Sequence, residues 1–111
     1  MKLIISIVQD VDSENLIQRL NEEGFRVTKI SSTGGFLKAG NTTLLSGVEE
    51  DVYPKFMKIM EENSKTRIVK KTIAPINIPG QAMIPVPVEV KVGGATIFII
   101  DVEKYIQIWA S

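Results

Sequence analysis

Residues 2–8 read KLIISIV, and this short, mostly aliphatic run decides the fold. A run of this length that is dominated by β-branched residues is typical of a strand buried on both faces, which therefore lies inside its sheet. Residues 9–24 follow as QDVDSENLIQRLNEEG and have the apolar spacing of an amphipathic helix. A buried strand that leads directly into such a helix indicates a fold in which helices cover a sheet.

The helix expected after this strand has recognisable ends. Leu16 and Leu20 lie on one apolar stripe, and Gly24 stands where a left-handed glycine commonly ends a helix. We expect Asp12 to be the N-cap and Val11 to pack against Leu16 as a hydrophobic staple. These signals predict a helix of about three turns.

The rest of the chain divides into short strands and a second helix. Pro54 is tolerated only in the first turn of a helix, so we expect the second helix to begin near Asp51. In chain order we expect strands at 25–32 and 42–48, a helix at 49–63 with Val52, Phe56, Ile59 and Met60 on one face, a strand at 67–73, a hairpin of 88–92 with 95–100 that turns at Gly93–Gly94, and a short closing helix at 101–108.

This order, β-α-β-β-α-β with an additional β-hairpin, is that of a ferredoxin-like sandwich. We therefore expect an α+β fold in which two helices cover one face of an antiparallel sheet, and a single domain over residues 1–111. The chain has no third long helix for the opposite face of the sheet, although the first strand is apolar on both sides. Self-association as a closed homo-oligomer would cover that face.

The composition excludes several classes of protein. The chain has 111 residues with no Cys and no His, and its 13 basic and 13 acidic residues give no net charge. Disulfides, thiolate chemistry and the commonest metal ligand and general base are therefore absent. No apolar run reaches the roughly 20 residues of a membrane span, and the N-terminus does not resemble a signal peptide. We expect a cytoplasmic protein without enzymatic activity, without a metal and without membrane insertion.

The basic residues are concentrated in two segments. Residues 24–47 carry Arg26, Lys29 and Lys38 without any acid, and residues 64–96 have a net charge of +4. A short segment of charge +3 suits a small anion, whereas polymeric nucleic acid requires a broader basic surface. An ordinary solvated face is the alternative interpretation of this charge.

Residues 33–41, TGGFLKAGN, are the glycine-rich segment in which we expect a ligand to bind. Tandem glycines let backbone N–H groups converge on an anion, Phe36 offers a flat surface to a base, and the Asn41 amide matches an adenine edge. Arg26 can clamp a phosphate and Thr28 shares its strand face. Together these residues supply the parts of an adenine nucleotide pocket, although a Gly-Gly loop with Phe36 in the core would be the structural alternative.

A second long loop is expected at residues 74–87. It holds four of the five prolines and Gly80. Loops of this length are often mobile or responsive to a ligand.

Three stretches of the chain resemble one known family. MKLIISIVQDVDS, FRVTKISSTGGFLKAGNTTLLSGV and PVPVEVKVGGATIFI are similar to the PII-like cyclic di-AMP receptor family of bacteria, the DarA or PstA type. The resemblance covers nearly the whole chain apart from residues 74–84 and the last few residues, and the TGGFL-x-AGNTT stretch is its most specific part.

The resemblance implies a PII-like homotrimer that binds one cyclic di-AMP in each cleft between neighbouring subunits and acts as a second-messenger receptor. It implies no enzymatic activity and no cofactor besides this ligand. The ligand-binding positions that it implies are Arg26, Thr28, Gly35, Phe36, Leu37, Asn41, Gly47, Phe98 and Gln107. Lys38 stands where the family commonly has Arg, and the mismatch of residues 74–84 leaves the downstream partner protein unknown.

Two other functions remain open from the residues. The chain could be a PII-type sensor of ATP or ADP that regulates a transporter or an enzyme. A nucleotide hydrolase is disfavoured because the glycine-rich segment lacks His and a carboxylate pair.

Overall fold

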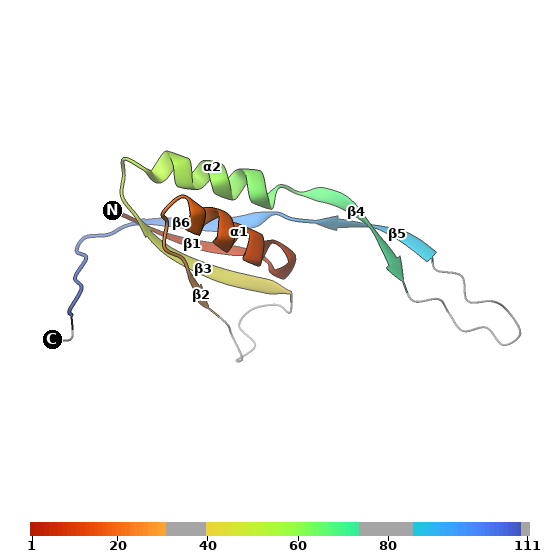
Figure 1. Ribbon diagram of the computed structural model, residues 1–111, viewed down its shortest axis with the longest axis horizontal. Helices are drawn as coiled ribbons and strands as arrows, with labels where there is room; N and C mark the ends of the chain where they lie inside the picture. Colours follow the sequence, from red (N-terminus) through yellow and green to blue (C-terminus); the bar gives the residue numbers. More distant parts are fainter. Residues whose placement is uncertain (31–39, 74–85, 110–111) are drawn as a thin grey trace, which may run out of the picture.

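The computed structural model describes residues 1–30, 40–73 and 86–109. Figure 1 shows two helices, α1 (Asp10–Glu22) and α2 (Tyr53–Ser64), that lie side by side along the main sheet. The six strands are β1 (Lys2–Gln9), β2 (Thr28–Ile30), β3 (Asn41–Val48), β4 (Arg67–Ile73), β5 (Val86–Val92) and β6 (Ala95–Asp101).

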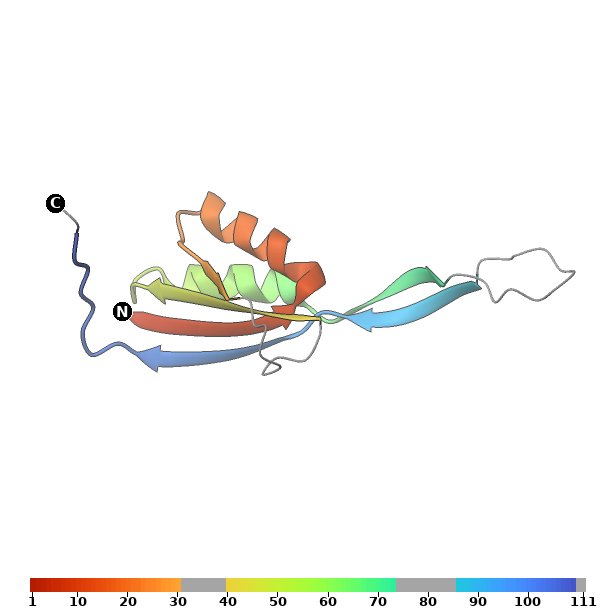
Figure 2. The same cartoon turned by 90° about the horizontal axis from the view of Figure 1, so that it is seen from below.

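The main sheet has the strand order β2-β3-β1-β6, and each of its pairings is antiparallel. This order, with both helices on one side of the sheet (Figure 2), is the ferredoxin-like arrangement and confirms the α+β prediction. The apolar run that begins the sequence forms β1, which lies inside the sheet between β3 and β6, as predicted.

The hydrophobic core lies between the main sheet and the two helices. Every second residue of β1 and β3 points toward the helices and is buried, as the alternation of a strand requires. Phe56 of α2 meets Phe25 edge to face with ring centroids 5.2 Å apart. The fully buried hydrophobic cluster consists of Ile4, Val8, Leu16, Leu20, Leu44, Val48, Phe56 and Met60.

The start of α1 corrects one prediction. The helix begins at Asp10, with Gln9 as its N-cap, so Asp12 lies inside the first turn and is not the cap. The Asp12 carboxylate is instead buried and accepts hydrogen bonds from both terminal nitrogens of Arg67, at 2.6 and 3.4 Å. Val11 is 59% exposed on the helix, so the predicted staple with Leu16 is also wrong. Gly24, with φ 87°, follows the helix as predicted.

The second helix also begins later than expected. Val52 is its N-cap and is 39% exposed, so the prediction that Val52 lies on the core face of the helix is wrong. Pro54 lies in the first turn, where the prediction placed it.

The last third of the chain differs most from the expectation. β5 pairs with β4, and β6 pairs with β1, so the predicted hairpin of residues 88–92 with 95–100 is wrong. Both glycines have positive φ angles, 98° at Gly93 and 92° at Gly94, as a two-residue turn would require. Their N–H groups, however, are bound by the side chain of Gln9 and the carbonyl of Ser64, and the chain continues from one sheet into the other.

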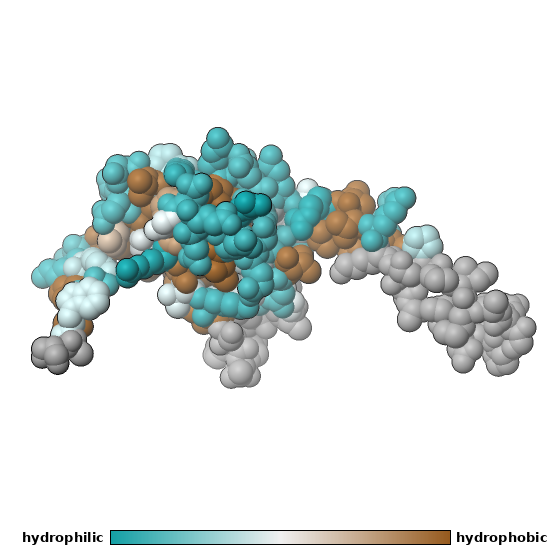
Figure 3. Space-filling model, viewed as in Figure 1, coloured by the Kyte–Doolittle hydropathy of each residue, from teal (hydrophilic) through white to brown (hydrophobic). Residues whose placement is uncertain are grey.

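The paired strands β4 and β5, here called the ribbon, project beyond the main sheet (Figure 1, Figure 2). β4 carries Arg67, Lys70 and Lys71, and such a charged strand suits solvent better than a place under the helices. β6, which reads ATIFIID, therefore completes the main sheet beside β1. Figure 3 shows hydrophilic residues over the helices and a hydrophobic patch on the ribbon.

Two further expectations are corrected at the ends of these strands. Residues 102–108 form no helix after β6, so the predicted closing helix is wrong. The expected loop at 74–87 ends sooner, because Val86 and Pro87 belong to β5, and residues 74–85 lie outside the described residues.

Candidate functional site

The side of the main sheet that faces away from α1 and α2 carries the candidate residues. The alternation of the strands and their register place every second side chain on this side, which we call the open face. Figure 2 shows both helices on the opposite side of the sheet. The open face consists of Leu3, Ile5, Ile7, Gln9, Thr28, Ile30, Asn41, Thr43, Leu45, Gly47, Thr96, Phe98 and Ile100.

The strand registers align these residues in rows across the sheet. Thr28 is opposite Leu45, Leu45 is opposite Ile5, and Ile5 is opposite Phe98, so one row crosses all four strands. Phe98 is 53% exposed at one end of this row, and Thr28 is exposed at the other. The row therefore joins two predicted ligand-binding residues through an apolar middle.

Arg26 and Gly47 lie together at one end of the open face. Arg26 is exposed in the connection between α1 and β2, while its neighbours Phe25 and Val27 pack against the core. The two residues line a hollow of about 340 Å³ that Glu23, Val48 and Lys55 also border. A Cβ on Gly47 would have the sulfur of Met1 as its nearest neighbour, at 3.5 Å, which is an ordinary van der Waals contact. The fold therefore does not require glycine here, although the missing side chain leaves space at the surface.

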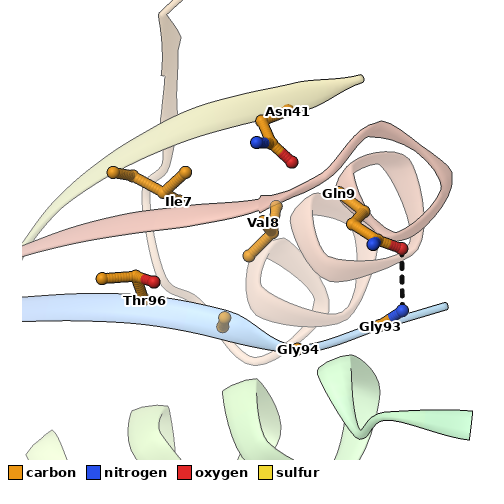
Figure 4. A pocket seen from close by; sticks show the side chains of 8 residues that line it. Ile7, Val8, Gln9, Asn41, Gly93, Gly94 and Thr96 are labelled. Atoms are coloured by element: carbon orange, nitrogen blue, oxygen red, sulfur yellow. Dashed lines mark hydrogen bonds between the residues drawn. The ribbon is translucent and has the colours of Figure 1, made fainter. Parts of the chain in front are cut away.

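Asn41 lies at the opposite end of β3, next to the root of the ribbon, by which we mean Gly93 and Gly94, where β5 of the ribbon continues into β6 of the main sheet. It is half-buried, it is paired with Gln9, and it lines a second hollow of about 270 Å³. Figure 4 shows the lining side chains: Asn41 comes from β3, Ile7, Val8 and Gln9 from β1, and Thr96 from β6, with Gly93 and Gly94 at the edge. An amide side chain in such a hollow can donate and accept hydrogen bonds at once.

The two ends of the open face are well separated within one chain. Asn41 and Gly47 are six residues apart on β3, which corresponds to about 20 Å at the rise of an antiparallel strand. The structure therefore brings Arg26 close to Gly47, but it does not bring either of them close to Asn41.

The remaining predicted positions are placed as follows. Gly35, Phe36 and Leu37, together with Lys38, lie outside the described residues. Gln107 is exposed in the segment that follows β6, where Ile108 and Trp109 are also largely exposed.

Two ion pairs join elements outside the open face. Lys2 binds Asp101 across β1 and β6, and this hydrogen bond lowers the pKa of the Asp101 carboxyl and raises the pKa of the Lys2 ammonium. The hydrogen bond to Asp12 likewise raises the pKa of Arg67. The ion pairs of the described residues do not include Arg26, so its guanidinium is available to an anion.

The described residues contain no group of three or more acidic residues placed to hold a metal ion. Neither helix in this part of the chain combines the length and the hydrophobicity that a bilayer crossing requires.

Sequence reasoning missed three polar neighbours of Asn41 on the open face. Gln9 lies directly across from Asn41 on β1, Thr43 lies two residues further along β3, and Thr96 lies on β6. The period-two alternation of β1 could have placed Gln9 on the same face as Ile5 and Ile7, and that of β3 could have placed Asn41 on the same face as Thr43 and Leu45. Only the register shows that the two amides are neighbours.

Comparisons with known proteins agree with this structure. The sequence model of a family described as cyclic-di-AMP receptor matches residues 1–108. A solved structure, described as a functionally unknown protein from Pediococcus pentosaceus ATCC 25745, is 37% identical, covers 96% of this chain and 96% of its own chain, and superposes with a TM-score of 0.75. The chain belongs to the cyclic-di-AMP receptor family, a family of receptors whose ligand is cyclic di-AMP.

Proposed function

We propose that this member of the cyclic-di-AMP receptor family forms a homotrimer and binds one cyclic di-AMP in each cleft between neighbouring copies. The protein then acts as a cytoplasmic second-messenger receptor without enzymatic activity. Ligand binding orders residues 33–41, and a downstream protein that remains to be identified reads this change. In such a mechanism the ligand favours one arrangement through its higher affinity for that arrangement.

The observation that carries the proposal is the open face itself. Four candidates, Thr28, Asn41, Gly47 and Phe98, belong to this face, and Arg26 lines a hollow beside Gly47 at the end of β3. The same face exposes large apolar side chains, with Phe98 53% and Ile100 49% accessible. Contiguous exposed apolar surface marks an interaction site, and further copies of the chain would cover it.

The separation along β3 supports a ligand that is shared between copies. Arg26 and Gly47 lie about 20 Å from Asn41 in one chain, at the rise of an antiparallel strand. In a closed trimer each copy presents one surface patch to one neighbour and a different patch to the next. We therefore assign the contacts of one ligand to two copies: the Arg26 end of one copy and the Asn41 end of its neighbour share one cleft, and Phe98 and Gln107 also contact the ligand across the boundary between copies.

The chemistry of each position suits a cyclic dinucleotide. The Arg26 guanidinium can hold a phosphate through two parallel hydrogen bonds, and the Thr28 hydroxyl adds a donor on the same face. Asn41 can pair with the donor and acceptor edge of adenine. Gly35, Phe36 and Leu37 would add backbone donors and a stacking surface, worth about 1–3 kcal/mol by analogy with base–aromatic stacking.

Calorimetric titration with cyclic di-AMP tests the proposal. Replacing Arg26 by Ala removes charged hydrogen bonds, and the expected loss of about 1.5–3 kcal/mol corresponds to a roughly 10- to 150-fold weaker affinity. Arg19→Ala is the matched control, because Arg19 carries the same charge on the helical side of the molecule, where it pairs with Glu22. Equal affinities in the two variants would contradict the assignment of Arg26.

A second pair of variants tests the base-reading position. Asn41→Ala is expected to weaken binding, whereas Asn21→Ala, on an exposed position of α1, is expected to leave it unchanged. Negligible heat with wild-type protein would end the proposal. Displacement of cyclic di-AMP by equimolar ATP would instead favour the sensor of ATP or ADP.

A further inference from the structure

Gln9 touches both the ligand end of the open face and the root of the ribbon. It is the last residue of β1, and the strand register pairs it with Asn41. Its side-chain oxygen accepts a hydrogen bond from the N–H of Gly93 at 2.7 Å (Figure 4). One residue therefore links a candidate ligand-binding residue, through its backbone pairing, to the junction between β5 and β6, through its side chain.

The residues on either side of Asn41 are tied to the same point. The N–H of Asp10 donates to the carbonyl oxygen of Gly40 at 2.8 Å, and the Thr42 hydroxyl donates to the Asp10 carboxylate. Residues 40–42 are thus held to the junction of β1 and α1 by backbone and side chain. A displacement of Asn41 would therefore also displace Gln9 and Asp10.

The root of the ribbon is itself fixed by several bonds. The N–H of Gly94 donates to the carbonyl oxygen of Ser64 at 2.5 Å, and Arg67 joins β4 to the buried carboxylate of Asp12 at 2.6 Å. A Cβ on Gly93 would lie 2.2 Å from the carbonyl oxygen of Lys65, so the chains cross here without spare room. A tight junction of this kind transmits a movement of β1 to the ribbon instead of absorbing it.

We infer that Gln9 is a positioning residue. It couples ligand binding at Asn41 to the orientation of the ribbon and to the protection of the ribbon's amides from hydrogen exchange. The inference rests on the proposed function, because it assigns a route by which the bound ligand reaches a surface far from the ligand. Gln9 acts through Gly93: its oxygen holds the Gly93 N–H, and its backbone holds Asn41 in register. Such coupling is reciprocal, so loosening the junction must also change ligand affinity to the same small extent.

Amide hydrogen exchange with and without cyclic di-AMP measures this coupling directly. Wild-type protein is compared with Gln9→Met, which keeps the length of the side chain but removes the oxygen acceptor, and with Gln9→Glu, which retains it. Saturating ligand is used throughout, so that differences in affinity between the variants do not enter. Calorimetry reports the affinity of each variant separately, and circular dichroism confirms that each is folded.

Ligand is expected to slow exchange in residues 86–94 of the wild type at least threefold. In Gln9→Met the Gly93 amide is expected to exchange about tenfold faster without ligand, and the ligand effect on the ribbon is expected to disappear, while the dissociation constant changes less than about threefold. Gln9→Glu is expected to restore both the protection and the ligand effect. Restoration by the acceptor oxygen would separate a positioning role from a loss of packing.

Other outcomes overturn the inference in distinguishable ways. A ligand effect of undiminished size in Gln9→Met, or wild-type protein that binds ligand with no change in the ribbon, refutes the coupling and leaves the proposed function intact. Loss of binding in Gln9→Met with normal binding in Gln9→Glu makes Gln9 a ligand contact and refutes its positioning role. Absence of binding by the wild type refutes the proposed function and the inference together.

Discussion

Replacing Gly93 by alanine tests how closely the ribbon is joined to the main sheet. Gly93 has φ 98°, and a Cβ at this position would lie 2.2 Å from the carbonyl oxygen of Lys65. The next residue, Gly94, has a similar φ of 92°, but the nearest atom to its Cβ would be the Thr66 hydroxyl oxygen at 3.6 Å. The two glycines thus share a backbone conformation and differ in the space around them.

This comparison gives a magnitude for each variant. A left-handed backbone costs alanine about 1–2 kcal/mol, and the lower entropy of the unfolded chain offsets about 0.4–1 kcal/mol of it. We therefore expect Gly94→Ala to lower the free energy of unfolding by about 1 kcal/mol. Gly93→Ala adds the overlap with Lys65, and overpacking of this kind costs about 1–3 kcal/mol more.

Urea unfolding followed by circular dichroism measures both variants at one protein concentration, because association would add to the apparent stability. Hydrogen exchange then shows whether the loss is concentrated in β4 and β5. Equal losses in the two variants, or a larger loss for Gly94→Ala, would refute the claim that the chains cross tightly at Gly93.

Three further predictions follow from the ion pairs and the open face. Phe98→Ala is expected to shift the protein toward smaller assemblies in sedimentation velocity while each chain stays folded, because Phe98 is 53% exposed in one chain and would be covered by another; unchanged assembly would contradict its place in an interface. Asp12→Asn is expected to speed amide exchange at the start of β4, because it weakens the charged bond to Arg67, and an unchanged exchange rate would show that the pair does not hold the ribbon. Asp101→Asn is expected to lower the melting temperature at neutral pH, with a difference from wild type that disappears in acid. The pKa of Asp101 lies below its ordinary value of 3.8 and that of Lys2 above 10.5, so the pair contributes between these values and is lost as the pH falls through the lowered pKa of Asp101. A difference that does not shrink as the pH is lowered step by step below 3.8 would contradict this origin.

Local signals in the sequence were sufficient for β1 and α1. The apolar run of β1, the stripe of Leu16 and Leu20, and Gly24 after α1 each act within a few residues, and each was predicted in the observed place. The alternation around Arg26 and Thr28 placed both among the exposed residues, but the strand predicted from residue 25 begins only at Thr28, so Arg26 precedes β2. These features follow from the periods of the helix and the strand alone.

Features that depend on distant partners could not be predicted in this way. Asp12 has the position of a helix cap, but Arg67, 55 residues later, binds its carboxylate. The Gly93–Gly94 pair has the backbone of a hairpin turn, but β5 pairs with β4 and β6 pairs with β1, and these partners lie far away in the sequence. The neighbourhood of Gln9 and Asn41 depends in the same way on strand register, which composition does not specify.

Native mass spectrometry with cyclic di-AMP tests the central claim most directly, because one spectrum counts both chains and ligands. The account predicts an assembly of three chains that takes up to three cyclic di-AMP molecules, and an assembly that Phe98→Ala weakens. A single chain that binds the ligand by itself, or a trimer that binds none, would contradict it.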